Sequence, residues 1–191
     1  MTSSVNKNVS VDLAIIGDAT VILEALIEEM KRQSFVPHKP TLEKWWSMIK
    51  GWQKRDCLAF DQQGDIIKPQ HAIKRLCELT EKHDVYVTTE VGQHQMWAAQ
   101  HFGFNKPNRW MTSGGLGTMG YGLPAALGVQ VAHPDALVID IAGEASFMMN
   151  MQELSTLAQY NLPVKMFIIN NEWMGMVRQW QELIHGGRYS E

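Results

Sequence analysis

The sequence is poor in the residues that mark metal, redox and membrane proteins. Its 191 residues include only two cysteines, Cys57 and Cys77, which do not form a CxxC pair, so cysteine-based metal or redox chemistry is not expected. No apolar run approaches the roughly 20 residues that span a bilayer. The first residues also lack the charged and apolar regions of a signal peptide. We therefore expect a cytoplasmic protein in a reducing compartment.

Strong charge of either sign is lacking as well. The formal net charge is −3 and no basic run or stripe occurs, so neither a nucleic-acid partner nor a membrane partner is expected. What the sequence does contain is enough apolar material for a core, since 45% of its residues are hydrophobic and 19% are charged. These values are typical of a soluble globular protein.

Apolar periodicity divides the chain into two parts at the polar, turn-rich segment 61–65. Before this segment the pattern predicts a buried strand over 11–16 and helices over 19–31 and 42–55. We interpret residues 1–65 as the end of a preceding domain followed by a linker. This part is too short to fold alone. Its helical tryptophans are expected to pack against domains outside the chain: Trp45, Trp46 and Trp52.

Beyond the boundary, strands alternate with helices. Helices are predicted over 69–82, 91–102, 125–132 and 147–160 and from 176 onward, and strands over 85–89, 136–142 and 164–169. This alternation is typical of an α/β domain with an open, doubly wound parallel sheet and helices on both faces. We place this domain over 66–191 and expect it to be incomplete, because no closing element follows the last helix. Three methionines are expected in the core beneath their helix: Met148, Met149 and Met151.

Polar residues follow two strands of the predicted sheet. Gly143 and Glu144 come directly after the strand 136–142, and Asn171 follows the next strand along the chain. Ligands of such folds bind at this edge of the sheet, where a glycine and a helix start suit a phosphate. A carboxylate and an amide oxygen at the same edge suit Mg²⁺ bound between protein and phosphates. Alternatively, Gly143 and Asn171 are turn residues and Glu144 caps a helix.

The run from Ile139 to Ser146, closing at Asn170-Asn171, resembles the signature of thiamine-diphosphate enzymes. That signature opens with Gly-Asp-Gly or Gly-Asp-Ala and closes with Asn-Asn. This chain departs from it at one position, where Glu144 stands in place of aspartate. The extra methylene of glutamate moves the carboxylate oxygens by over ~1 Å, and Mg²⁺ is strict about distance and geometry.

Further segments narrow the resemblance to the catalytic subunit of acetolactate synthase. They are the runs Val91–Gln100, Ser113–Pro124 and Gly175–Ser190, and residues 11–30 also resemble the end of the central, FAD-associated domain of that enzyme. The resemblance covers nearly all of 66–191. It implies an enzyme of branched-chain amino acid biosynthesis. Such an enzyme decarboxylates pyruvate on thiamine diphosphate and transfers the two-carbon unit to a second 2-keto acid.

The resemblance also implies roles for individual residues. Those expected to hold the diphosphate of the cofactor, largely through the backbone, are Gly92, Gln93, His94, Gly143, Ala145 and Ser146. Those expected to bind Mg²⁺ are Glu144, the side chain of Asn171 and the carbonyl of Trp173. Gly117 and Met119 contact the aminopyrimidine ring, and Met119 acts in catalysis as a wedge that bends the cofactor. The substrate channel is assigned to Met176, Val177 and Trp180.

Plainer interpretations stay open for several of these residues. The His94 side chain could simply be a polar residue at a helix start, and Met119, Met176 and Trp180 could be core residues. Other thiamine-diphosphate carboligases or acetyltransferases, such as glyoxylate carboligase or sulfoacetaldehyde acetyltransferase, keep the metal and diphosphate motifs. A non-catalytic remnant module is a further alternative. A nicotinamide dehydrogenase is excluded, because no GxGxxG motif follows the first strand.

The resemblance finally implies components that this chain does not contain. These are most of the FAD site and the glutamate that protonates the aminopyrimidine, which in the family lies in the amino-terminal domain of a neighbouring subunit. A homodimer or tetramer with a small regulatory subunit is implied for the complete enzyme. We therefore expect this chain alone to be inactive and to need the missing domains as partners.

Overall fold

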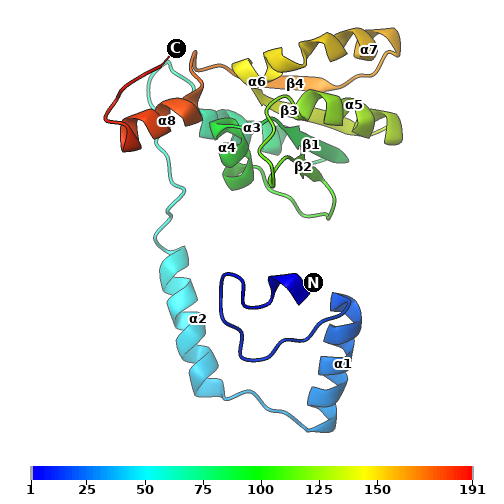
Figure 1. Ribbon diagram of the computed structural model, residues 1–191, viewed down its shortest axis with the longest axis vertical. Helices are drawn as coiled ribbons and strands as arrows, with labels where there is room; N and C mark the ends of the chain where they lie inside the picture. Colours follow the sequence, from blue (N-terminus) through cyan, green and yellow to red (C-terminus); the bar gives the residue numbers. More distant parts are fainter. Residues whose placement is uncertain (1, 191) are drawn as a thin grey trace. The chain divides into compact units, whose positions relative to one another are not determined.

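The computed structural model describes residues 2–190 and divides into two compact units between Cys57 and Leu58 (Figure 1). The expected boundary at 65/66 lies within the segment 54–68, which contains no helix or strand. The two units are described separately below.

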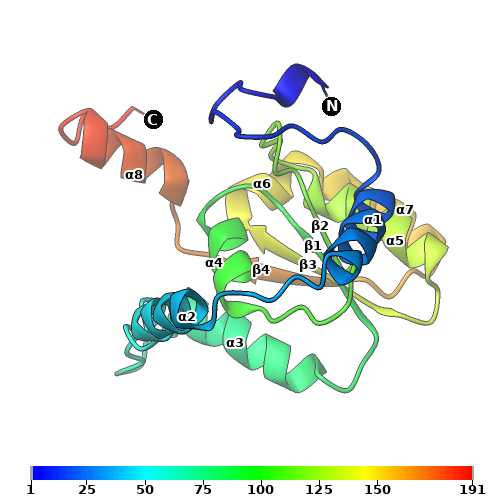
Figure 2. The same ribbon diagram turned by 90° about the horizontal axis from the view of Figure 1, so that it is seen from below.

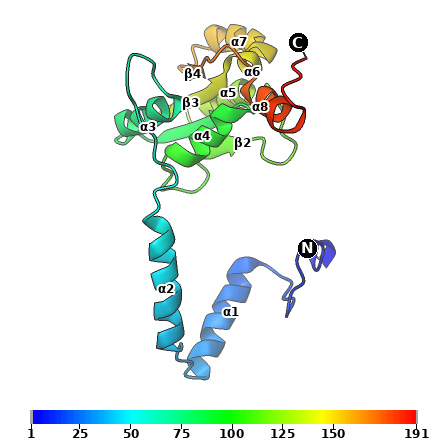
Figure 3. The same cartoon turned by 90° about the vertical axis from the view of Figure 1, so that its left-hand side faces the viewer.

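The first unit consists of a short 3-10 helix and two α-helices (Figure 3). Helix α1 (Ala19–Arg32) begins where the Asp18 carboxylate accepts the N–H groups of Thr20 and Val21, at 2.9 and 3.2 Å. Helix α2 (Lys39–Gln53) begins with a proline in its first turn, a position at which the missing N–H costs nothing. The 3-10 helix η1 spans Thr2–Ser4.

The strand predicted over 11–16 is wrong. These residues have no regular secondary structure and are exposed. A β-strand is stabilised by hydrogen bonds to a neighbouring strand, and no strand occurs among the described residues 2–57. No side chain of residues 3–57 is buried within the unit. The tryptophans of α2 are about half exposed: Trp45, Trp46 and Trp52.

A four-stranded, all-parallel sheet forms the centre of the second unit, in the order β2-β1-β3-β4. The strands are β1 (Val85–Thr89), β2 (Trp110–Thr112), β3 (Leu137–Gly143) and β4 (Lys165–Ile169). Thr89 pairs with Ile141, and Gly143 pairs with Ile169. The segments that follow β1, β3 and β4 therefore leave the sheet at the same edge.

Helices cover both faces of this sheet (Figure 2). They are α3 (Pro69–Thr80), α4 (Gln93–His101), α5 (Gly122–Ala132), α6 (Glu144–Met149) and α7 (Leu154–Gln159), with a 3-10 turn η2 at Met151–Glu153. Helix α8 (Gly175–Ile184) follows β4 and lies to one side of the sheet.

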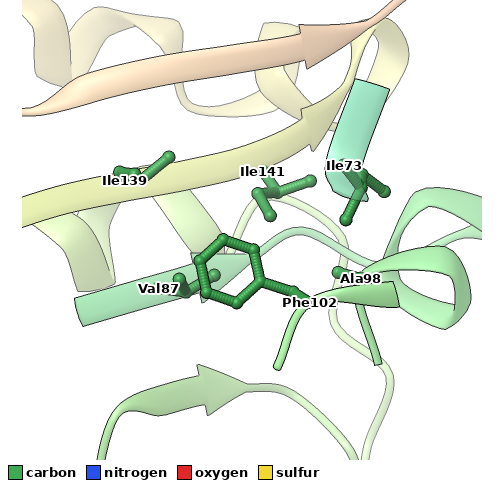
Figure 4. Packing of buried hydrophobic residues seen from close by; sticks show 6 residues of the cluster. All are labelled: Ile73, Val87, Ala98, Phe102, Ile139 and Ile141. Carbon is green, nitrogen blue, oxygen red and sulfur yellow. The ribbon is translucent and has the colours of Figure 1, made fainter. Parts of the chain in front are cut away.

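Two hydrophobic clusters, one on each face, fix these layers. Side chains of a strand alternate between its faces, so neighbouring residues of β1 and β3 belong to different clusters. One cluster joins these strands to α3 and α4 through Ile73, Val87, Ala98, Phe102, Ile139 and Ile141 (Figure 4). The other joins them to α5 and α7 through Tyr86, Leu123, Ala126, Val138, Leu157 and Val164. The doubly wound parallel α/β fold is thereby confirmed.

The structure corrects three details of the second unit. The helix predicted over 147–160 is divided into α6, η2 and α7, and the short strand β2 was not predicted. The methionines expected in the core are instead largely exposed: Met148, Met149 and Met151. The break at Asn150 redirects the chain, so a single amphipathic face does not continue from α6 into α7. Among the described residues, no helix has the length and apolar character that crossing a membrane requires.

Candidate active site

A pocket of about 50 Å³ lies at the carboxyl edge of the sheet. Four segments line it: the start of α4 after β1, the loop before α5, the start of α6 after β3, and the segment that leads from β4 into α8. Small-molecule sites commonly enclose roughly 300–1,000 Å³. The pocket is therefore large enough to hold only part of a ligand of cofactor size.

The structure gathers twelve of the fourteen residues that the sequence suggested for the site. They are Gly92, Gln93, His94, Met119, Gly143, Glu144, Ala145, Ser146, Asn171, Trp173, Met176 and Val177. Gly117 and Trp180 do not line the pocket. Gly117 lies in the loop before α5 with a left-handed φ of 68°, and Trp180 is 54% exposed on α8.

The start of α4 supplies hydrogen-bond donors to the pocket. Gly92 is the N-cap residue, and Gln93 and His94 are the first two residues of the helix. The first N–H groups of an α-helix have no acceptor within the helix. Together with the helix dipole, such groups form a binding site for an anion.

The His94 ring is a buried, neutral part of the pocket wall. It is 6% exposed, and burial lowers the pKa of His94 to about 4, although a hydrogen bond to the Glu90 backbone opposes this shift. The ring packs against Gly143, where a Cβ would lie 2.7 Å from Nδ1. A side chain at residue 143 would therefore displace the imidazole. Nε2 is buried and has no hydrogen-bond partner.

Two further lining residues carry side-chain oxygens. Glu144 is the first residue of α6, directly after β3, and Asn171 follows β4. The Asn171 Oδ1 accepts the N–H of Trp173 at 3.2 Å, which folds the segment after β4 into a tight turn. No lysine or arginine lines the pocket, and Glu144 forms no ion pair with any of residues 2–190. The pocket thus combines a carboxylate with an anion-binding helix start and contains no basic side chain.

Ser146 ties two walls of the pocket together. Its side chain is 2% exposed, and Oγ donates to the carbonyl oxygen of Val91 at 3.2 Å. The hydroxyl is therefore engaged within the protein, and any contact with a ligand falls to the backbone of α6.

Sequence reasoning missed some of the lining residues: Val91, Trp97, Ile169, Met174 and Gly175. Four of them are apolar side chains beside predicted residues, and residue type alone does not distinguish them from core. A larger cavity of about 440 Å³ lies near the start of β1. There Asp84 pairs with Lys106 and Arg109 at 3.0 and 3.1 Å. Both cations already pair with Asp84, so that cavity is a weaker candidate for a charged ligand.

This fold and this site define an α/β ligand-binding domain of the doubly wound class, with an anion site and oxygen donors at the carboxyl edge of its sheet. The chain belongs to the thiamine pyrophosphate enzymes, because the family model of their C-terminal TPP-binding domain matches residues 90–191.

Over 99% of its length the chain is 49% identical to the acetolactate synthase isozyme 3 large subunit of Escherichia coli K12. It is 50% identical to the acetolactate synthase large subunit of Buchnera aphidicola from Acyrthosiphon pisum and 47% identical to that of Porphyra purpurea, in each case over 98% of its length. The chain spans about a third of the length of these curated relatives, at 33%, 32% and 31%.

Proposed function

We propose that this chain is the diphosphate-binding part of an acetolactate synthase catalytic subunit. Such an enzyme decarboxylates pyruvate and transfers the two-carbon unit to a second 2-keto acid. The proposal is supported by the family model, by the names of the relatives and by the gathering of the expected residues around one pocket. The observation that carries it is a carboxylate, Glu144, in the same pocket as the start of α4, with no lysine or arginine in the lining.

The charges of the pocket support Mg²⁺ as the link between protein and diphosphate. A diphosphate beside Glu144 brings anion against anion, and His94 is neutral at pH 7. A bound cation is therefore needed for both anions to occupy one small site. The carboxylate of Glu144, the amide oxygen of Asn171 and the carbonyl of Trp173 are the hard oxygen donors that Mg²⁺ prefers. These residues line one pocket, and this donor set fits the metal.

The other residues of the site bind and orient. The backbone N–H groups of Gln93 and His94 would hold phosphate oxygens, and Gly143 with Ala145 would keep the start of α6 open to them. Met119 would fix the orientation of the aminopyrimidine, with Gly117 beside it. Met176, Val177 and Trp180 would exclude water from the substrate channel. Thiamine diphosphate, when bound, supplies the electron sink for decarboxylation, while the protein supplies orientation and electrostatics.

The proposal extends to the complete protein. We propose that residues 1–65 end a central, FAD-associated domain, and that the remaining domains complete a cytoplasmic homodimer or tetramer with a small regulatory subunit. The support for this extension is that the chain spans only a third of its relatives. The exposed apolar side chains of α1 and α2 are consistent with further domains.

Calorimetric titration of thiamine diphosphate with Mg²⁺ tests the site. The titrated protein is this chain mixed with the other two thirds of a relative's large subunit. We expect Glu144→Ala to weaken cofactor binding by more than ~10-fold, because removing a charged ligand of a bound ion costs about 2 kcal/mol or more. Glu153→Ala, the same change outside the pocket, is the matched control.

Each outcome has a distinct meaning. Equal binding in Glu144→Ala and the control would mean that the metal lies elsewhere. Absence of binding in the unsubstituted protein would favour a non-catalytic remnant. Binding without acetolactate formation from pyruvate would favour another thiamine-diphosphate carboligase or acetyltransferase.

A further inference from the structure

A buried carboxyl group that the proposed function does not use lies beneath the candidate site. Glu90 directly follows β1 and precedes the pocket segment Val91–His94, and it is 0% exposed. Its Oε1 accepts the backbone N–H of Leu123 at 3.0 Å. Leu123 is the second residue of α5 and is itself fully buried. The bond therefore links the end of β1 to the helix that follows the Met119 loop, residues 113–121.

Helix α5 has no cap of its own. Tyr121, at the N-cap position, makes no side-chain hydrogen bond to the helix. The N–H of Leu123 would thus be a buried donor without an acceptor, which costs about 1–3 kcal/mol. Glu90 serves as the cap from a different element, and its carboxylate suits the positive end of the helix dipole.

The start of α5 lies directly on the end of β1. At Gly122, an added Cβ would collide with Oδ1 of Asp140 and would lie 2.8 Å from the backbone nitrogen of Glu90. Only glycine permits this approach. The backbone at the start of α5 is therefore in direct contact with the backbone at the end of β1.

Burying these carboxyl groups lowers the stability of the fold, and packing alone does not account for them. Oε2 of Glu90 and Oδ2 of Asp140 are both buried without a hydrogen-bond partner. The other Asp140 oxygen accepts the Thr88 hydroxyl at 3.0 Å, and neither carboxyl pairs with a basic side chain among residues 2–190. Buried carboxyls without a cation destabilise a fold relative to apolar residues of the same size. Such groups are concentrated at functional sites.

We propose that Glu90 is a positioning residue of the cofactor site. By holding the N–H of Leu123, its carboxylate fixes the Met119 loop relative to the segment that carries Gln93 and His94. The inference rests on the proposed function, because these two segments are walls of the proposed cofactor site. The hydrogen bond itself acts in the chain without any ligand.

Two substitutions of similar size separate the hydrogen bond from packing. Glu90→Leu fills the space but has no acceptor, whereas Glu90→Gln keeps an acceptor oxygen for the Leu123 N–H. Amide hydrogen exchange on the full chain, without cofactor, measures the protection of the backbone N–H groups in the Met119 loop and at Leu123. We expect Glu90→Leu to accelerate exchange over 113–123 by ~10-fold, with β3 unchanged, and Glu90→Gln to restore it to within about threefold of the unsubstituted chain.

Cofactor titration on the chain supplied with the missing domains adds a second measurement. Glu90→Leu should raise the Kd of thiamine diphosphate with Mg²⁺ by ~10-fold, and Glu90→Gln should recover most of this loss. Failure of the unsubstituted protein to bind the cofactor would refute the proposed function, while the exchange data would still decide the role of Glu90.

Two results would overturn the inference. One is exchange over 113–123 in a folded Glu90→Leu variant that matches the unsubstituted chain. The other is a Glu90→Gln variant that loses loop protection although an acceptor is present. If Glu90→Leu does not fold, Glu90→Ala takes its place, since it also removes the acceptor for the Leu123 N–H.

Discussion

Among single residues, the carboxyl groups in and near the site differ in their exposure to the pocket. Glu144 lines the pocket, where a cation can reach it. Asp140 is fully buried one layer below. Burial, and next the neighbouring Glu90 carboxyl, raise the pKa of Asp140 to about 7, while the Thr88 hydroxyl opposes the shift. The residue of α5 that faces the Asp140 carboxyl is Gly122, which has no charge. Asp140 thus holds a proton in the folded chain under conditions in which it loses that proton after unfolding.

This difference predicts a pH dependence of stability. The pKa of Asp140 is raised from 3.8 in folding, so the folded state binds more protons between about pH 4 and 7, and the free energy of unfolding falls as pH rises through that range. The total effect is at most about 4 kcal/mol. Asp140→Asn should flatten this slope and raise stability at pH 8. Urea denaturation from pH 5 to 8 measures it.

Asp135→Asn, the same substitution at an exposed position, is the control for this measurement. An Asp140→Asn variant with the slope of the unsubstituted chain would show that Asp140 is ionised throughout.

At the scale of elements, α8 is the least anchored helix of the second unit. It contains no buried residue. It nevertheless contacts the start of α4, where Nε2 of Gln93 donates to Oε1 of Gln179 at 2.9 Å. This bond joins a helix that carries Met176 and Val177 to the residue proposed to hold the diphosphate. The position of α8 over the pocket therefore depends on few contacts.

We expect Gln179→Leu to loosen α8. Loss of one side-chain hydrogen bond, worth about 1 kcal/mol, should accelerate amide exchange over 175–184 by ~5-fold, with β3 unchanged. Gln181→Leu makes the same change on the same helix without touching Gln93, since the Gln181 side chain donates instead to Ser190 at 2.9 Å. Equal acceleration over 175–184 in both variants would argue against a specific contact between α4 and α8.

For the molecule as a whole, we propose that the chain provides one side of a site. The pocket encloses about 50 Å³, too little for a complete cofactor. The first unit presents apolar side chains without burying any of them, among them Trp45, Trp46 and Trp52. Exposed apolar surface of this extent is typical of an interface. Both observations support the proposal that further protein surface encloses the ligand.

We accordingly expect the purified chain to form no acetolactate from pyruvate with thiamine diphosphate, Mg²⁺ and FAD. Addition of the other two thirds of a relative's large subunit should restore product formation, because it supplies the groups that enclose the cofactor. Glu144→Ala in the same mixture is the control. Acetolactate formation by the chain alone would contradict the proposal that other domains complete the site.

Most of the strands and helices beyond residue 66 could be predicted from the sequence, because apolar periodicity and turn residues are local signals. Spacing also indicated part of the pocket, since Glu144 and Asn171 follow strands that end at one sheet edge, while the resemblance to acetolactate synthase indicated most of the other lining residues. Prediction from the sequence failed at residues 11–16, where an apolar run has no strand to pair with, and at Met148, which lies beside a helix break that periodicity did not reveal.

The roles of groups whose surroundings come from distant segments became visible only in the folded chain. Glu90 and Leu123 are 33 residues apart and meet because α5 packs on β1. Asp140 and Thr88 are 52 residues apart and meet through the register of parallel strands. The pKa of a side chain and the capping of a helix depend on burial and on neighbours in space. Those neighbours come together only when the sheet forms, so local sequence patterns do not reveal them.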